Sequence, residues 1–248
     1  MLSALILAGV FYWQAKQGKT PGSPKSSNET STLPQTSENE IATSSPPFVV
    51  KGEISGGNPA KKQIIFTFDG GASNVSVQKI LETAKKHSVK LTFFVTAKFV
   101  EQNPEPIKKI AQEGHEIFNH TYSHPHLTQL TDGQIREELK KCDDVVYNLT
   151  GKNTKPYFRP PYGDRDQRVL KIAQEEGYQS VYWSTDALDW MAGRTAEQVK
   201  ERIYSNLKPG AIILMHVGDD ITGNVLDEVF TYIENQGYKI VSLTEGLK

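Results

Sequence analysis

The stretch QIIFTFDGG at residues 63–71 decides the fold class. Its first six residues form a short, largely apolar run, which predicts a strand buried inside a sheet. A carboxylate, Asp69, follows the run directly, and Gly70 and Gly71 come next. Glycine lets another group approach the backbone closely. Residues 69–71 therefore suit a strand end that faces a site, although an aspartate there is also often just a helix cap.

Outward from this strand, the chain alternates between strand-like and helical stretches. Further strands are predicted at residues 90–95, 115–118, 178–183, 211–215 and 238–241, and helices at 75–87, 106–113, 131–149, 165–176, 196–207 and 225–236. This alternation predicts an α/β fold with a parallel sheet covered by helices. With about seven strand–helix units, we expect a distorted (β/α) barrel in a single catalytic domain. An open doubly wound sheet is the second choice, but residues 68–71 lack the glycine spacing of a dinucleotide site.

The first 47 residues differ in composition from the rest. Residues 2–13 are almost wholly apolar, which is shorter than the roughly 20 residues of a membrane-spanning helix. They suit a signal peptide or membrane signal anchor over residues 1–15, with an ordinary packed N-terminal helix as the alternative. Residues 16–47 are rich in Ser, Thr and Pro, which predicts a disordered tether. Residues 48–248 form the predicted globular domain, and the layout indicates an extracytoplasmic protein, membrane-anchored or secreted.

The net charge and the cysteine content argue against two classes of function, namely nucleic-acid binding and catalysis by a cysteine nucleophile. The formal net charge is −1, whereas a nucleic-acid-binding domain normally carries a basic excess. Nucleic acid is therefore not an expected partner, and the only predicted membrane contact is the N-terminal segment. Cys142 is the only cysteine, and its place in a charged helical stretch favours a partly buried structural residue over a nucleophile. We expect a monomer.

Polar side chains recur where the predicted strands end. They are Asp69 after residues 63–68, Asn119, His120 and His124 after 115–118, Arg159 ahead of the helix at 165–176, Asp186, Asp189 and Trp190 after 178–183, and His216 after 211–215. In barrels and open parallel sheets, the carboxyl ends of the strands carry the chemistry. We therefore expect these side chains to meet in one catalytic mouth.

The two histidines His120 and His124 are candidate metal ligands. Their spacing of four residues would place both imidazoles on one face of a helical turn, a common way to bind Zn²⁺. A polar loop is the alternative, and His126 is either a spare ligand or a decoy.

Arg159 and His216 have different local settings. Two prolines follow Arg159 and fix the backbone there, which suits a charge held in place. His216 ends an apolar strand, where a buried histidine with satisfied hydrogen bonds is the ordinary reading. Asp189 is the carboxylate that such a histidine would take as its partner.

Taken in order, these pieces resemble the polysaccharide deacetylase family, also known as the NodB-homology domain or carbohydrate esterase family 4. The resemblance runs over residues 64–241 and rests on five motifs, TFDGG at 67–71, HTYSHP at 120–125, RPPYG at 159–163, DALDW at 186–190 and LMH at 214–216. It implies a metal-dependent hydrolase that removes acetyl groups from N-acetylated sugars of a glycan. Cell-wall peptidoglycan or a chitin-like polymer is the expected substrate.

The resemblance also implies a role for each matched residue. Asp69 would be the general base, and Arg159 would hold and tune it. His120 and His124 would bind a divalent metal, commonly Zn²⁺, whose bound water the base deprotonates.

On the other side of the reacting carbon, His216 would be the general acid, oriented by Asp189. The backbone N–H of Tyr162 would donate to the oxyanion, and Trp190 and Leu214 would line the acetyl pocket.

The chain departs from the family pattern at one position. The first motif of the family carries a second aspartate, a metal ligand, where this chain has Gly70. Losing an anionic ligand should weaken metal binding. Asn74, His126, Asp164 and Asp219 are candidate substitutes that the sequence does not rank. Two alternatives to the N-deacetylase remain open, namely a glycan-binding pseudoenzyme with a degraded metal site and an O-acetyl esterase acting on xylan-type polymers.

Overall fold

The structure, a computed structural model, describes residues 52–71 and 73–248. The predicted signal segment at residues 1–15 and the tether at 16–47 lie outside this range. Within it, no helix combines the length and apolar character needed to cross a membrane.

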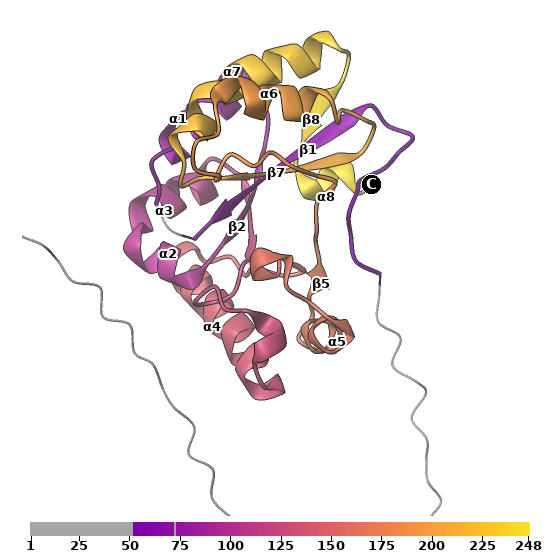
Figure 1. The fold of residues 1–248 in the computed structure, drawn as a ribbon. Helices are drawn as coiled ribbons and strands as arrows, with labels where there is room; N and C mark the ends of the chain where they lie inside the picture. The colour runs from indigo at the N-terminus through magenta and orange to yellow at the C-terminus, as the bar shows by residue number, and fades with distance from the viewer. Residues whose placement is uncertain (1–51, 72) are drawn as a thin grey trace, which may run out of the picture. The chain divides into compact units, whose positions relative to one another are not determined.

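The described residues form one parallel sheet. Its strands are β1 (Gln63–Gly70), β2 (Thr92–Val95), β3 (Glu116–Asn119), β4 (Tyr157–Phe158), β5 (Gln179–Ser180), β6 (Thr185–Asp186), β7 (Ala211–His216) and β8 (Lys239–Val241). The order is β5-β4-β3-β2-β1-β7-β6, with β8 paired to β1. Every strand pair is parallel. Helices follow most strands, so the predicted distorted barrel in a single domain is confirmed (Figure 1).

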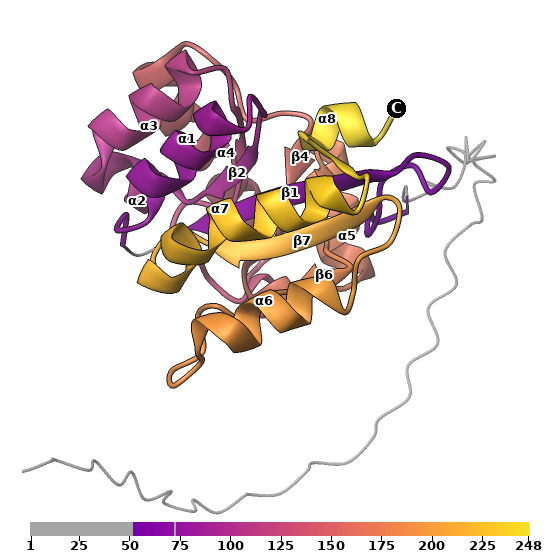
Figure 2. The ribbon, with the colours of Figure 1, turned by 90° about the horizontal axis from the view of Figure 1, so that it is seen from above.

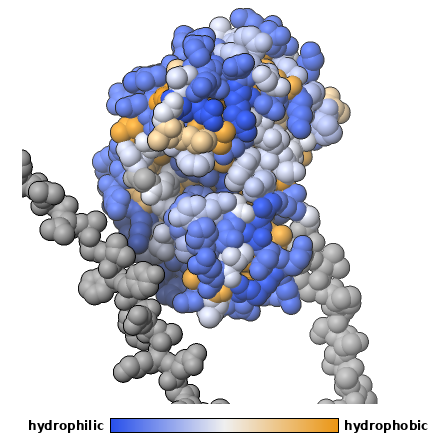
Figure 3. Space-filling view, in the orientation of Figure 1, coloured by the Kyte–Doolittle hydropathy of each residue, from blue (hydrophilic) through white to orange (hydrophobic). Residues whose placement is uncertain are grey.

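Helices cover the outside of the sheet, except the last one, whose Leu243 packs with Ile65 and Phe94 in the barrel interior. They are α1 (Val77–Lys86), α2 (Ala97–Gln102), α3 (Pro104–Gln112), α4 (Asp132–Thr150), α5 (Gln167–Glu175), α6 (Ala196–Tyr204), α7 (Asp220–Asn235) and α8 (Leu243–Gly246), with short 3₁₀ turns η1 (Leu127–Gln129) and η2 (Pro161–Gly163). Figure 2 shows α6 and α7 beside β7, and α1, α2 and α3 gathered on the side of β2. The face seen in Figure 3 is mostly hydrophilic with small apolar patches, as expected when the apolar faces of the helices point inward.

The central strand β1 is buried on both faces, as its apolar run predicts. Phe66 and Phe68 belong to the core between the sheet and the helices, whereas Ile65 packs with Phe94 in the barrel interior. Successive side chains alternate between the two faces of a strand. Asp69 is therefore on the same face as Ile65, at the carboxyl end of the barrel interior.

Strand register brings the polar strand ends together. Asp69 on β1 is directly opposite His216 on β7. On the other side of β1, Val95 on β2 is opposite Asn119 on β3. The backbone N–H of Arg159 then donates to the carbonyl of Asn119 at 2.9 Å.

The predicted strand at residues 178–183 is only partly correct. It is reduced to β5, and the short strand β6 follows separately. The backbone explains the break, because the N–H of Tyr182 donates to the carbonyl of Ile54 whereas that of Ser184 donates to the carbonyl of Ile212. The chain changes neighbours within three residues, so no continuous strand can form.

Two helix predictions also needed correction. α2 was not predicted, and α7 begins five residues before the predicted start at residue 225. The early start follows from Asp219, whose carboxylate accepts a hydrogen bond from the backbone N–H of Ile221 at 2.8 Å and caps the helix.

Candidate active site

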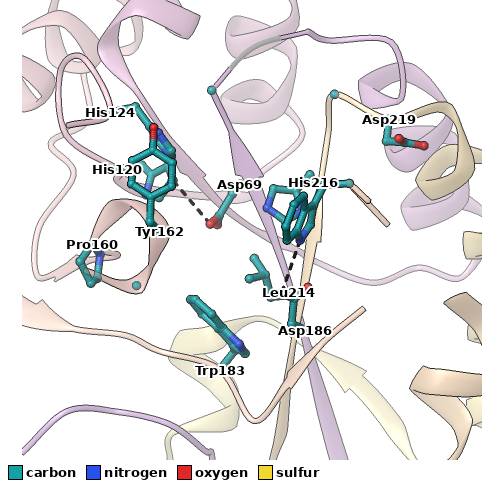
Figure 4. A pocket seen from close by; sticks show the side chains of 14 residues that line it. Asp69, His120, His124, Pro160, Tyr162, Trp183, Asp186, Leu214, His216 and Asp219 are labelled. Atoms are coloured by element: carbon teal, nitrogen blue, oxygen red, sulfur yellow. Dashed lines mark hydrogen bonds and ion pairs between the residues drawn. The ribbon is translucent and has the colours of Figure 1, made fainter. Parts of the chain in front are cut away.

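A pocket opens at the carboxyl ends of the strands. Figure 4 shows His120, His124 and Tyr162 on one side of Asp69 and His216 on the other. Seven of the predicted site residues line this pocket, namely Asp69, His120, His124, Tyr162, Trp190, Leu214 and His216. The other two, Arg159 and Asp189, are fully buried and contact the pocket through Asp69 and His216. The predicted strand-end cluster therefore exists as one group in space.

A buried arginine holds Asp69 in place. Nη1 of Arg159 donates to Oδ1 of Asp69 at 2.7 Å. The remaining donors reach Oγ1 of Thr67 and the carbonyls of Val181 and Tyr182 at 3.0–3.2 Å. Burial, the largest influence, would raise the pKa of Asp69, but the charge and hydrogen bond of Arg159 together with the charges of the nearby histidines lower that pKa overall. Asp69 is consequently a carboxylate that can accept a proton.

The segment from His120 to His124 is a bend, so the predicted helical turn is wrong. Thr121 and His124 both have positive φ angles, 71° and 63°. The side chain of Asn119 accepts a hydrogen bond from the N–H of Thr121, and Oγ1 of Thr121 accepts one from the N–H of His124. These bonds fold the chain back tightly enough to bring the two imidazole centroids to 4.9 Å. The two imidazoles are therefore close, as expected, but a bend and not a helical turn brings them together.

Both imidazoles are electron-pair donors. Nδ1 of His120 is 2.8 Å from the carbonyl oxygen of Arg159, and a carbonyl only accepts, so Nδ1 carries the proton. Nε2 of His120 is then left 3.5 Å from Oδ2 of Asp69. Burial lowers the pKa of both histidines, to about 4 for His124. A neutral ring nitrogen facing a carboxylate across this gap is an arrangement that a cation would stabilise.

His120 and His124 supply only two of the ligands that a divalent metal needs. In the described residues, no three His, Cys, Asp or Glu side chains form a group that could hold a metal ion. The four candidate third ligands have other partners. Asn74 donates to Asn103, His126 stacks on Tyr162 and lies 3.6 Å from Asp164, Asp164 accepts from Thr128, and Asp219 caps α7.

His216, at the end of β7, forms a second pair with Asp189. Nδ1 of His216 is 3.0 Å from Oδ1 of Asp189, and the backbone N–H of His216 donates to Oδ2 at 2.7 Å. The hydroxyl of Thr222 on α7 also donates to Asp189. Burial alone would lower the pKa of His216, but the hydrogen bond and the charge of Asp189 raise it overall. The raised pKa favours the protonated imidazole, which would suit a proton donor.

Comparison with known proteins settles the family. The profile described as polysaccharide deacetylase matches residues 56–181. The chain belongs to the polysaccharide deacetylase family. It is 39% identical over 193 residues to the peptidoglycan-N-acetylmuramic acid deacetylase PdaA of Bacillus subtilis, covering 76% of this chain and 73% of that one. It is 36% identical to the peptidoglycan-N-acetylglucosamine deacetylase of Bacillus cereus, covering 74% and 67%.

Solved structures of deacetylase-family members agree with this fold. PdaA of Bacillus subtilis superposes with a TM-score of 0.75 at 38% identity, over 79% of this chain and 84% of that one. A protein from Bacillus anthracis described as a family 4 carbohydrate esterase pseudoenzyme superposes with a TM-score of 0.76 at 33% identity, over 79% and 69%. Structural similarity within this deacetylase family therefore includes both a named deacetylase and a named pseudoenzyme.

Aromatic side chains line the mouth of the deacetylase pocket. Tyr162 has φ of 58°, which turns its ring outward so that the residue is 62% exposed. Its ring contacts His124 edge-on at 4.4 Å between centroids and stacks on His126 at 4.2 Å. Trp190 lies edge-on to His216 at 6.4 Å, and the floor contains Leu214. Such rings suit the apolar faces of sugar units.

Sequence reasoning missed three supporting residues of this deacetylase site. Thr67 binds Arg159, Thr222 binds Asp189, and Trp183 lines the pocket. Thr67 could have been found, because it is two residues before Asp69 and therefore on the same face of the strand. Thr222 lies in a helix far along the chain, and no local pattern marks it.

Proposed function

We propose that this protein is a hydrolase that removes acetyl groups from N-acetylated sugars of cell-wall peptidoglycan or a chitin-like polymer. One observation carries the proposal. Two charge-paired groups on neighbouring strands, Asp69 with Arg159 and His216 with Asp189, face one pocket. Asp69 can accept a proton, and His216 can donate one. The relatives from Bacillus subtilis and Bacillus cereus are named as peptidoglycan deacetylases, which favours peptidoglycan as the polymer.

The proton transfers follow from the two pairs. The Asp69 carboxylate takes a proton from the attacking water, and Arg159 keeps the carboxylate ionised and oriented until then. The Nε2 proton of His216 passes to the leaving amine, and Asp189 stabilises the imidazolium beforehand. A base and an acid placed on opposite sides of the tetrahedral centre serve attack and departure in turn.

Developing negative charge on the acetyl oxygen needs stabilisation. The backbone N–H of Tyr162 is the proposed protein donor for this oxyanion. His120 and His124 are the proposed ligands of a divalent cation, most simply Zn²⁺, which would supply Lewis acidity towards the acetyl carbonyl. Trp190 and Leu214 would enclose the acetyl methyl group.

The proposed setting is outside the cytoplasm. Peptidoglycan lies beyond the cytoplasmic membrane, so an enzyme acting on it must be exported. We propose membrane anchorage or secretion through residues 1–15, a tether at 16–47, a catalytic domain at 48–248, and action as a monomer. Fractionation of cells producing the full chain, together with sedimentation of the purified protein, tests these points.

Acetate release is the direct test of the activity. The purified protein is incubated with peptidoglycan, chitin oligomers and acetylated xylan, each with and without a chelator. We expect release from an N-acetylated glycan, reduced by the chelator and restored by Zn²⁺. Release from acetylated xylan alone would establish an O-acetyl esterase instead, and no release from any of the three polymers would exclude both enzyme assignments.

The pH dependence of kcat/KM should be bell-shaped. Turnover needs Asp69 ionised and His216 protonated. The pKa of Asp69 is lowered below 3.8 and that of His216 is raised above 6.5. Activity should therefore decline on the acid side as the pH falls through the lowered pKa of Asp69, and on the alkaline side as the pH rises through the raised pKa of His216. In Asp189→Asn the alkaline limb should move to lower pH, and an unmoved limb would show that His216 is not the titrating acid.

A glycan-binding pseudoenzyme is the second candidate. Gly70 and the absence of a three-ligand group among the described residues favour it, as does the likeness to the Bacillus anthracis pseudoenzyme. Elemental analysis of the purified protein separates the two functions when combined with the acetate assay. Glycan binding without metal and without acetate release would establish the pseudoenzyme.

A further inference from the structure

The carboxylate of Asp189 is bonded at both ends of the segment that links β7 to α7. At the β7 end, Nδ1 of His216 lies 3.0 Å from Oδ1, and the backbone N–H of His216 donates to Oδ2 at 2.7 Å. At the other end, the hydroxyl of Thr222 in the first turn of α7 also donates to Oδ2. Asp189 is fully buried, so these contacts and not bulk water orient its carboxylate.

The two oxygens of Asp189 have different tasks. The last torsion of an aspartate side chain is soft, so its hydrogen bonds decide how the carboxylate is rotated. Oδ2 is held by donors from two elements, the N–H of His216 on β7 and the hydroxyl of Thr222 on α7. Oδ1 is thereby left facing Nδ1 of His216. With the backbone donor alone, the carboxylate could turn about Oδ2 and move Oδ1 away from the ring.

The position of Thr222 is fixed independently of Asp189. The buried Ser76, at the start of α1, donates its backbone N–H to the carbonyl of Val217 at 3.1 Å and its hydroxyl to the carbonyl of Asp219. The same hydroxyl accepts from the N–H of Gly223 at 3.0 Å. A Cβ atom at Gly223 would lie 2.9 Å from this oxygen, so the glycine permits the close approach. These bonds hold the first turn of α7, and Thr222 with it, against α1.

The hydroxyl of Thr222 does not make the bond that is usual for a threonine in a helix. Such a hydroxyl commonly donates to the backbone carbonyl one turn earlier. Thr150 on α4 donates in this way to Val146, and Thr231 on α7 donates to Asp227. Thr222 donates instead to a carboxylate from another part of the chain. Satisfying a buried hydroxyl within the helix therefore does not account for its contact.

We infer that Thr222 is a positioning residue of the acid pair, because its hydroxyl holds the Asp189 carboxylate in the rotation that directs Oδ1 at the His216 ring. Without that hydroxyl, Oδ1 would face Nδ1 less directly, and the protonated ring would lose part of its stabilisation. The inference deepens the proposed function and rests on the role of His216 as the proton donor.

Other ionisable groups near His216 stay unchanged when Thr222 is replaced. Burial lowers the pKa of His216, whereas the hydrogen bond and charge of Asp189, followed by the charges of Asp69 and Asp186, raise it overall. The other titratable side chains that line the pocket are Asp69 on β1, His120 and His124 after β3, Tyr162 on η2, Asp186 on β6 and Asp219 before α7. A change in the His216 pKa of a Thr222 variant therefore reports on the contact with Asp189.

The pKa of His216 tests the inference without reference to turnover. NMR titration follows the Cε1–H signal of the ring, which is assigned by its absence in His216→Gln. Thr222→Val replaces the hydroxyl by a methyl group of similar size. We expect it to lower the pKa of His216 by roughly half a pH unit, about a threefold loss of proton affinity. Thr222→Ser keeps the hydroxyl and should stay close to wild type. The alkaline limb of kcat/KM for acetate release should move to lower pH together with the NMR value.

Matched controls separate positioning from general effects on α7. Thr231→Val removes an exposed hydroxyl from the same helix and should leave the pKa of His216 unchanged. Thr222→Ala also lacks the hydroxyl and gives the same reading where the valine variant does not fold. An unchanged or raised pKa in Thr222→Val, or an equal fall in Thr222→Ser or in Thr231→Val, would each overturn the inference. A protein with the predicted pKa values that releases no acetate would contradict only the proposed enzyme function.

Discussion

Replacing Asp69 by Asn should lower kcat/KM for acetate release by about 10²–10⁴-fold, the usual contribution of a general base. The amide keeps the size of the side chain and can still accept a hydrogen bond from Arg159 through its oxygen, but it cannot take a proton from water. Steady-state kinetics on the best glycan substrate measures the effect. Unchanged kinetics would remove Asp69 from the proposed role.

The control for Asp69→Asn must exclude a loss of fold. Asp143→Asn is a suitable substitution, because the half-buried carboxylate of Asp143 accepts hydrogen bonds from Thr154 and does not line the pocket. We expect Asp143→Asn to leave kcat/KM nearly unchanged. Circular dichroism and thermal unfolding of both variants show whether the two substitutions leave the native structure comparable.

Replacing Arg159 by Met should impair both activity and stability. The guanidinium is fully buried and is the counter-charge of Asp69, so its removal leaves a buried carboxylate without a positive partner. Breaking a buried pair in this way costs about 3–5 kcal/mol of unfolding free energy. Urea denaturation measures the loss, and kcat/KM should fall because Asp69 is no longer held ionised.

The pH dependence of this loss identifies its cause. In the wild-type chain the lowered pKa of Asp69 gives stability that is present above pH 3.8 and lost as the pH falls through the lowered value. In Arg159→Met, burial without a counter-charge raises that pKa above 3.8, so the folded state binds the proton more readily than the unfolded state. The difference between the two proteins should therefore be largest at neutral pH and shrink in acid. A difference independent of pH would indicate lost packing instead, and Asp69→Asn/Arg159→Met should recover part of the stability.

Much of the fold was predictable because β1 and β7 are buried on both faces. Long apolar runs such as residues 211–215 mark central strands without reference to distant residues. β4 and β6 have two residues each, and nothing in so short a segment distinguishes a strand from a loop. Their pairing is imposed by neighbouring strands, so it could not be predicted from local sequence.

Part of the site was predictable from the sequence as well. Each residue that follows a predicted strand or occupies a family motif could be identified, namely Asp69, His120, Arg159 and His216. The limited room beside Gly70 was not predictable, since a side chain there would meet Phe99, which belongs to the unpredicted helix α2.

The pairing of β1 has a consequence for when the chain can become native. β1, the first strand, is bonded on one side to β7 and on the other to β8 and β2, so its partners include the last two strands of the chain. During synthesis the edge of Gln63–Ile65 that pairs with β8 stays unpaired until residue 241 has emerged. Contacts between such distant segments slow folding because a long loop must close first. The barrel therefore completes only after translation of the domain, which leaves an interval in which an unfolded chain can be delivered to an export pathway.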